Sequence, residues 1–158
     1  MFRFIDDLNA INDGGEFERC YKDIYPPELE LKKENIGHDN ATFLDLDIKI
    51  NENGTFSLKL YDKRDAFPFS IVRLPYLSSN IPSRIFYASV SGEILRIARC
   101  TSEITEFKIS CKTLINRVKK QGAKPKLLTR TLNKTFNNHI NEFSPFFNSV
   151  VEFRQGVM

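Results

Sequence analysis

Two adjacent carboxylates near the start of the chain have the type and spacing that nucleotidyl transfer requires. Asp6 and Asp7 stand between two short apolar runs, residues 2–5 and 8–11. We predict that these runs are strands and that the Asp pair forms the turn of a β-hairpin. A rigid turn can project both carboxylates toward Mg²⁺ ions, which stabilise a phosphoryl group during transfer. An ordinary solvated turn presents the same residues, so the rest of the chain must decide between the two interpretations.

The composition excludes several classes of protein. The chain has 158 residues, of which 41% are hydrophobic and 12% aromatic, so it can bury a core and is not a disordered chain. No apolar run reaches the roughly 18–20 residues of a membrane helix, and we expect no membrane partner. The early carboxylates occupy the place of a signal peptide's apolar stretch, so we expect no secretion signal.

Cysteine and histidine usage argues against disulfide, zinc and hydrolase chemistry. Cys20, Cys100 and Cys111 share no CxxC spacing, so we expect a reducing, intracellular compartment, with nucleus and cytoplasm not distinguished. His38 and His139 have no nucleophile or zinc motif around them. The sequence also contains no GxGxxG or GxxxxGK[ST] loop for nucleotide phosphates.

Charge is divided unevenly along the chain. The formal net charge is +3, but residues 1–62 carry −7 and residues 63–158 carry +10. An acidic half joined to a basic half is typical of metal-binding carboxylates beside a phosphate-binding surface. Two ordinary solvated faces with segregated charges would give the same division.

The first half of the chain has the patterns of strands and one short helix. We predict a helix over residues 17–24, stopped by Pro26 and Pro27, and a strand over 29–32. Residues 41–50 approximate period-two alternation and form a predicted hairpin with residues 55–61. Together with the N-terminal hairpin, these patterns predict an antiparallel, sheet-rich half.

The second half is predicted to be helical, which makes the fold class α+β. Pro82 and Pro125 can each open a helix, Ser102 can cap the helix between them, and Gly122 can end it. The residues after 141 show no steady period and are expected to form an irregular tail. The predicted core faces contain Phe86, Val90, Ile94 and Ile97, then Phe107, Cys111, Leu114 and Val118, then Leu128, Leu132, Phe136 and Ile140.

A series of short motifs gives the Asp pair its context. Phe4-Ile5-Asp6-Asp7 has the form aromatic-x-Asp-Asp, and it is followed in order by residues 29–34, 41–48, 60–64 and 76–82. Their order and spacing resemble the C-terminal part of reverse transcriptases of the Penelope-like retroelement type, over roughly residues 2–140. The resemblance implies an RNA-directed DNA polymerase with part of a palm in 1–80, a helical thumb in 81–140 and a tail in 141–158.

The resemblance also assigns roles to the carboxylates. It implies that Asp6 and Asp7 are catalytic residues and Mg²⁺ ligands, with Asp6 the more direct ligand. Asp45 matches the family's Phe-Leu-Asp strand, where a structural and a catalytic role are both open. Ile81 replaces a histidine that is often present at the entry to the thumb.

Basic residues receive roles in the same way. Lys63 and Arg64 would lie near the primer grip, on the primer strand. Lys32 or Lys33 would approach the incoming triphosphate, or would be exposed lysines at the end of a strand.

The family's further palm aspartate, its fingers and its GIY-YIG endonuclease have no counterpart in these residues. We therefore expect an incomplete polymerase that is inactive alone and binds Mg²⁺ weakly. Its partners would be an RNA/DNA duplex and the missing N-terminal polymerase portion. A truncated reading frame, a degenerate copy of the element and a relic without activity all remain open.

A second hypothesis is a nucleic-acid-binding module without catalysis. Residues 84–134 contain 12 Lys and Arg but only 3 Asp and Glu. Such helices would follow the phosphate backbone of a duplex with little sequence preference. A solvated helix end with favourable charge at its C-terminus is the alternative. The residues expected to contact phosphates are Lys112, Arg117, Lys119, Lys120, Lys124 and Lys126.

Overall fold

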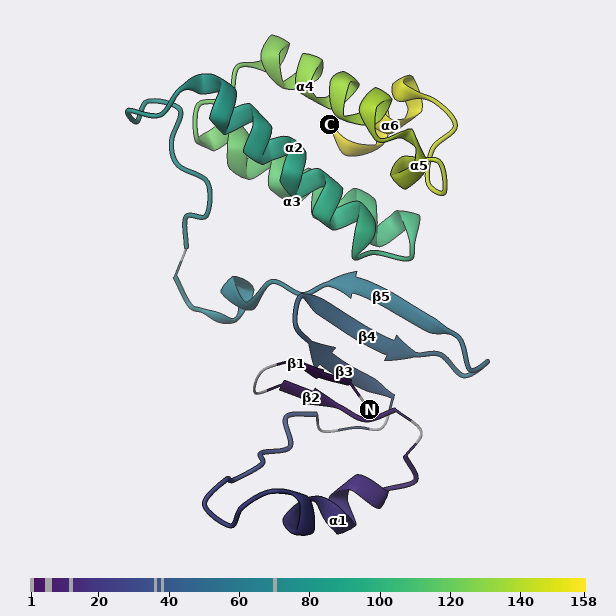
Figure 1. Cartoon of the computed structure of the whole chain (residues 1–158). Coiled ribbons are helices and arrows are strands. Elements are labelled where there is room, and N and C mark those ends of the chain that lie inside the picture. Colours follow the sequence, from purple (N-terminus) through teal and green to yellow (C-terminus); the bar gives the residue numbers. More distant parts are fainter. Residues whose placement is uncertain (1, 5–6, 12, 36, 38, 70) are drawn as a thin grey trace.

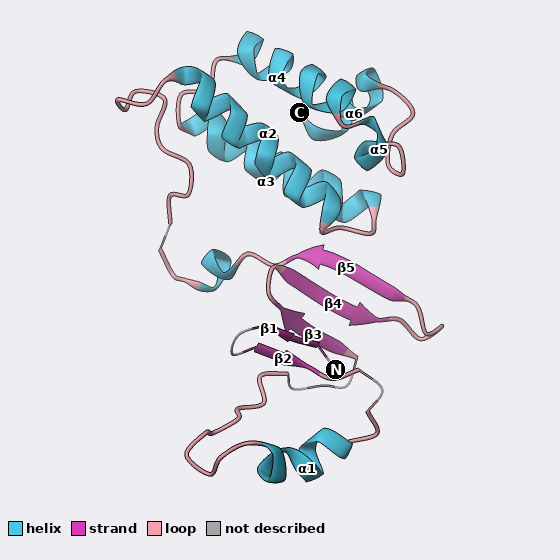
Figure 2. Ribbon diagram, viewed as in Figure 1, coloured by secondary structure: helices cyan, strands magenta, loops and turns pink. Residues whose placement is uncertain are grey.

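A computed structural model describes residues 2–4, 7–11, 13–35, 37, 39–69 and 71–158 (Figure 1). The strands lie in the N-terminal part and most of the helices in the C-terminal part, so the fold is mixed α+β (Figure 2). This confirms the predicted fold class.

The N-terminal hairpin consists of β1 (Phe2–Phe4) and β2 (Asp7–Asn9), which are antiparallel. Phe4 pairs with Asp7, so Asp7 is the first residue of β2 and does not lie in the turn as predicted. Ile5 and Asp6 lie outside the described residues. The predicted hairpin is confirmed, but its strands are shorter than the apolar runs.

Helix α1 (Glu16–Ile24) follows the hairpin and confirms the predicted helix. The Asp13 carboxylate accepts hydrogen bonds from the backbone N–H groups of Gly15 and Phe17, which supports the first turn. The helix ends at Tyr25, just before the two prolines, and the Arg3 guanidinium lies 5.8 Å from the centre of the Tyr25 ring. This contact ties β1 to the end of α1.

A three-stranded antiparallel sheet follows, with strand order β3–β4–β5. Its strands are β3 (Asn40–Phe43), β4 (Leu46–Ile50) and β5 (Phe56–Leu60). The predicted single strand over 41–50 is wrong, because a turn at Leu44 and Asp45 divides it and Phe43 pairs with Leu46. The predicted strand over 29–32 is also wrong, since these residues form no regular element.

The C-terminal part begins with a short 3-10 helix, η1 (Lys63–Ala66), and continues with α2 (Ser83–Arg99) and α3 (Ile104–Lys120). Helix α4 (Pro125–Asn138) starts at the predicted proline, and Gly122 adopts φ +94° just after α3, as expected for a residue that ends a helix. The segment expected to be an irregular tail instead carries α5 (Ile140–Phe143) and α6 (Val150–Val157).

Ser102 does not cap α3, whose N-cap is Glu103. It instead makes three hydrogen bonds with the backbone of Leu58 in β5. Its N–H and its hydroxyl donate to the carbonyl at 3.0 and 3.4 Å, and its hydroxyl oxygen accepts from the N–H at 2.8 Å. The residue therefore joins the helices to the edge of the sheet.

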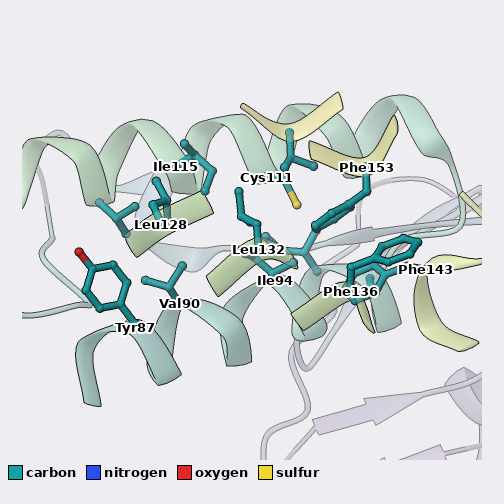
Figure 3. Close-up of a cluster of buried hydrophobic side chains, with 14 of the residues drawn as sticks. Tyr87, Val90, Ile94, Cys111, Ile115, Leu128, Leu132, Phe136, Phe143 and Phe153 are labelled. Carbon is teal, nitrogen blue, oxygen red and sulfur yellow. The ribbon is translucent and has the colours of Figure 1, made fainter. Parts of the chain in front are cut away.

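The hydrophobic core lies among the helices (Figure 3). The predicted apolar faces supply most of it, but Ile140 is exposed and Leu114 is only partly buried. The C-terminal segment adds Phe143, Phe147 and Phe153, and the ring centres of Phe143 and Phe153 are 4.9 Å apart. In the described part of the chain no strand residue is buried in this core itself, but Leu60 at the end of β5 is partly buried and packs against it.

Candidate carboxylate site and nucleic-acid interface

Of the two adjacent aspartates, only Asp7 lies within the residues that the structure describes. It occupies the first position of β2, and its side chain is exposed. Within the described residues it takes part in no ion pair or side-chain hydrogen bond. Its carboxylate is therefore available to a cation or a substrate.

The chemistry of this carboxylate fits Mg²⁺, which takes hard oxygen ligands and usually keeps several waters beside one or two carboxylates. Among the described residues, no group of three or more His, Cys, Asp or Glu side chains is arranged to hold a metal. Asp6, the other predicted ligand, lies outside the described residues. Asp45 lies in the turn between β3 and β4 and pairs with an arginine of α2.

Lys32 and Lys33 lie in the extended segment after α1, and both are exposed. Lys33 forms an ion pair with Glu18 of α1. The pair fixes this segment against the helix, and a triphosphate would have to compete with Glu18 for the lysine.

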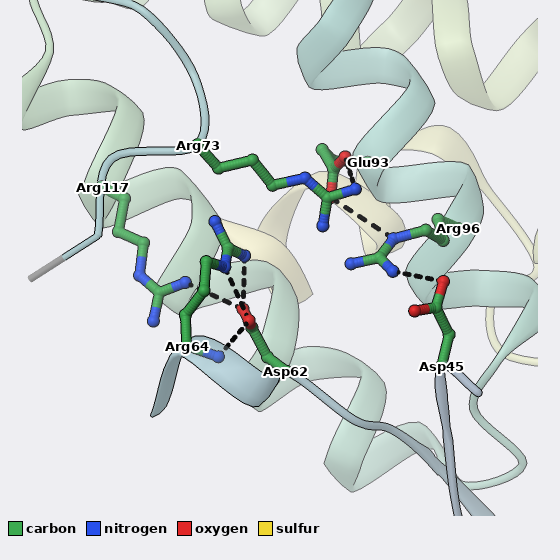
Figure 4. Close-up of polar contacts among 7 residues, drawn as sticks. All are labelled: Asp45, Asp62, Arg64, Arg73, Glu93, Arg96 and Arg117. Carbon is green, nitrogen blue, oxygen red and sulfur yellow. Dashed lines mark hydrogen bonds and ion pairs between the residues drawn. The ribbon is translucent and has the colours of Figure 1, made fainter. Parts of the chain in front are cut away.

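Asp62 is the centre of the first of two charged clusters where the sheet meets the helices (Figure 4). The backbone N–H and the guanidinium of Arg64 donate to its carboxylate, the Nε at 2.6 Å, and Arg117 of α3 approaches it at 3.4 Å. Partial burial would raise the pKa of Asp62, but the hydrogen bonds and charge of Arg64 and the charge of Arg117 lower the pKa to about 2. The predicted primer-grip residue Arg64 is thus held by a carboxylate, while its neighbour Lys63 is exposed.

The second cluster joins the sheet to α2 (Figure 4). Arg96 Nη1 lies 2.6 Å from an Asp45 carboxylate oxygen, and its Nε lies 3.5 Å from Glu93. Arg73 approaches the other oxygen of Glu93 at 2.9 Å. Glu93 and Arg96 are three residues apart on α2, but no local spacing links them to Arg73 or Asp45, so sequence reasoning did not identify this cluster.

The predicted phosphate-binding residues fall into separate groups. Lys112 and Lys119 are exposed on α3 and seven residues apart, which places them on one face of that helix. Lys120 and Lys124 line an open cavity of about 550 Å³, and Lys124 and Lys126 line a neighbouring one with Arg130. Arg117 instead reaches Asp62.

No protein-family model, curated protein or solved structure matches this chain. In the part of the chain that the structure describes, none of the helices has the length and apolar character to cross a bilayer.

Proposed function

We propose that the chain is the catalytic-hairpin and thumb portion of an RNA-directed DNA polymerase that extends a primer by two-metal nucleotidyl transfer. The observation that carries the proposal is Asp7 at the first position of β2 in the antiparallel hairpin, where it is exposed and, among the residues that the structure describes, forms no ion pair. The order of elements supports it: a carboxylate hairpin, a helix, a small sheet and then a basic helical bundle.

In this function the bound Mg²⁺ ions would neutralise charge on the transferred phosphoryl group. Asp7 and Asp6 would hold them at the hairpin. Lys63 would contact the primer backbone at the end of the sheet, and Asp62 would keep the Arg64 guanidinium in a fixed position beside it.

The test is binding of a labelled RNA–DNA primer–template with a recessed 3′ end and the complementary deoxynucleoside triphosphate, followed by fluorescence anisotropy. We expect tighter binding with Mg²⁺ than with EDTA, and we expect Asp7→Asn to remove the difference. Glu52→Gln is the matched control, since Glu52 is also an exposed turn carboxylate. An Asp7→Asn variant that keeps the whole Mg²⁺ effect would contradict the proposal.

A non-catalytic nucleic-acid-binding module is the second candidate. It is favoured by residues 107–141, which contain nine Lys and Arg and no Asp or Glu. Duplex binding should then weaken with salt, independently of Mg²⁺ and Asp7. Replacing both Lys112 and Lys119 with Ala should lower the slope of log K against log salt by about 0.9 per lost contact with B-form DNA. Absence of duplex binding at low salt would exclude this function.

A further inference from the structure

One end of the helical bundle holds a cavity that the proposed polymerase chemistry does not use. It has a volume of about 550 Å³, opens to solvent, and is lined by residues of the segment 76–83, the end of α3 and the start of α4. These three parts of the chain lie at the same end of the helical bundle (Figure 1). The start of α3 meets the sheet through Ser102 and Leu58, whereas Arg117, near the cavity end of α3, reaches Asp62. Because α3 has 17 residues, about 25 Å of helix separates the two ends.

The charges of the cavity suit an anion. Lys120 and Lys124 line it, and neither has an ion-pair partner within the described residues. The two stretches that build it, residues 66–92 and 107–141, contain no Asp or Glu. Lys124 is shared with the second cavity, lined also by Lys126 and Arg130, so the positive charge continues along the first turns of α4.

An aromatic side chain stands beside these lysines. Tyr76 lines the same cavity and is 52% exposed, so about half of this residue is accessible to a ligand. Ser78 and Ser83 add exposed hydroxyl groups to the wall. Lysines beside an exposed aromatic ring are the combination by which proteins hold single-stranded nucleic acid, with phosphates on the lysines and a base stacked on the ring.

The walls are fixed by hydrogen bonds that do not depend on a ligand. The backbone carbonyl of Gln121 accepts from the N–H of Leu77 at 2.9 Å, and its side-chain amide donates to the carbonyl of Leu74 at 2.6 Å. The Tyr87 hydroxyl accepts from the N–H of Lys124 at 2.9 Å. The loop that carries Tyr76 and the start of α4 are therefore positioned before binding, which lowers the entropic cost of binding.

We infer that this cavity is a binding site for single-stranded nucleic acid, with Lys120 and Lys124 on the phosphates and Tyr76 stacked on a base. The site is separate from the carboxylate hairpin, and it rests on the proposed nucleic-acid function. The openness to solvent and the continuation toward Arg130 fit a strand that passes through rather than a ligand that is enclosed.

The test compares a labelled 12-nucleotide single strand with a 12-base-pair RNA–DNA hybrid by anisotropy over a salt series. Tyr76→Leu should weaken single-strand binding by about five-fold or more and leave hybrid binding unchanged. Phe56→Leu is the control, since Phe56 is a similarly exposed aromatic on β5. Lys120→Ala should lower the single-strand salt slope by about 0.7, whereas Lys112→Ala, on the same helix, should not.

Circular dichroism of each variant checks that the helices are intact. The inference is overturned if Tyr76→Leu has no effect, or if it weakens single-strand and hybrid binding equally. If the wild-type chain binds the hybrid but these variants bind the single strand normally, only this site is refuted. If the wild-type chain binds neither probe at low salt, the proposed function and this site are both refuted.

Discussion

Asp45 and Arg96 are 51 residues apart in the sequence, yet a carboxylate oxygen and a guanidinium nitrogen of the pair lie 2.6 Å apart. Asp45 lies in the turn between β3 and β4, and Arg96 lies in the last turns of α2. The pair therefore joins the turn of the sheet to the helical bundle.

Breaking the Asp45–Arg96 pair should lower the stability of the chain only slightly. Asp45 is 62% exposed, and exposed ion pairs contribute about 0.2–1 kcal/mol. We expect Asp45→Asn to lower the free energy of unfolding by that amount, measured by urea denaturation, and to have less effect in high salt. In an Arg96→Gln background, Asp45→Asn should not lower the free energy of unfolding further. If the two substitutions lowered it additively, Asp45 and Arg96 would not stabilise the chain through their contact with each other.

The Asp62 cluster should make stability depend on pH. The pKa of Asp62 is lowered to about 2, against an ordinary value of 3.8 in the unfolded chain. Its stabilising contribution is therefore complete above about pH 4 and is lost as the pH falls toward 2. We expect Asp62→Asn to be less stable than the wild-type chain at pH 6, by roughly 1 kcal/mol after solvent screening, and the two to converge near pH 2.

Urea denaturation between pH 2 and 6 measures this difference. In an Arg64→Gln background the pH-dependent difference should become smaller, because the guanidinium hydrogen bonds and charge are lost while the backbone N–H of residue 64 and Arg117 remain. If the free energies of unfolding of Asp62→Asn and the wild-type chain differed by the same amount at every pH, a lowered pKa of Asp62 in the folded chain would be contradicted.

Leu44 is the residue at which backbone strain is expected. Its φ of +55° is the only positive value among the described residues other than glycine. A left-handed conformation costs an L-residue about 1–2 kcal/mol, and glycine avoids that cost but loses about 0.4–1 kcal/mol through the entropy of the unfolded chain. Leu44→Gly should therefore raise the free energy of unfolding by up to about 1 kcal/mol, measured by thermal and urea denaturation; a lower stability would contradict this prediction.

Mg²⁺ binding by the chain alone should be weak. Two carboxylates of one hairpin leave most of the oxygen positions around the ion to water. We expect a dissociation constant comparable with the weakest protein Ca²⁺ sites, about 10⁻⁴–10⁻³ M or higher. Isothermal titration calorimetry measures it, and micromolar binding that is lost in Asp7→Asn would show that the site contains further ligands.

The helices were the most predictable part of the fold, because their signals are local. Pro125 marks a start by its fixed φ, and Gly122 marks an end because glycine tolerates a positive φ. The four-residue steps of Leu128, Leu132 and Phe136 identify a buried face. The turn at Leu44 was not predictable in this way, since a leucine with a positive φ carries no turn signal. The alternation of residues 41–50 therefore suggested one strand where the structure has two.

The candidate sites likewise differ in whether local sequence signals could identify them. The Asp pair could be found because its residues are adjacent in the sequence. The cavity with Tyr76 and Lys120 could not, because the two residues are brought together only when the loop before α2 packs against the end of α3. Arg73 and Arg117, which reach Glu93 and Asp62, likewise come from other segments of the chain.

Because the buried core belongs to the helices, the two halves of the chain should exchange their amide hydrogens with solvent on different timescales. The strands and α1 can open in a sub-global step that leaves the core intact, so their protection should correspond to a smaller free energy than global unfolding. Amides in the middle of α2, α3 and α4 should exchange only when the whole chain unfolds. Strands β1 and β2 would then belong to the part of the molecule that opens at the lower free energy, while Tyr76 and Lys120 lie beside helices that open only on global unfolding.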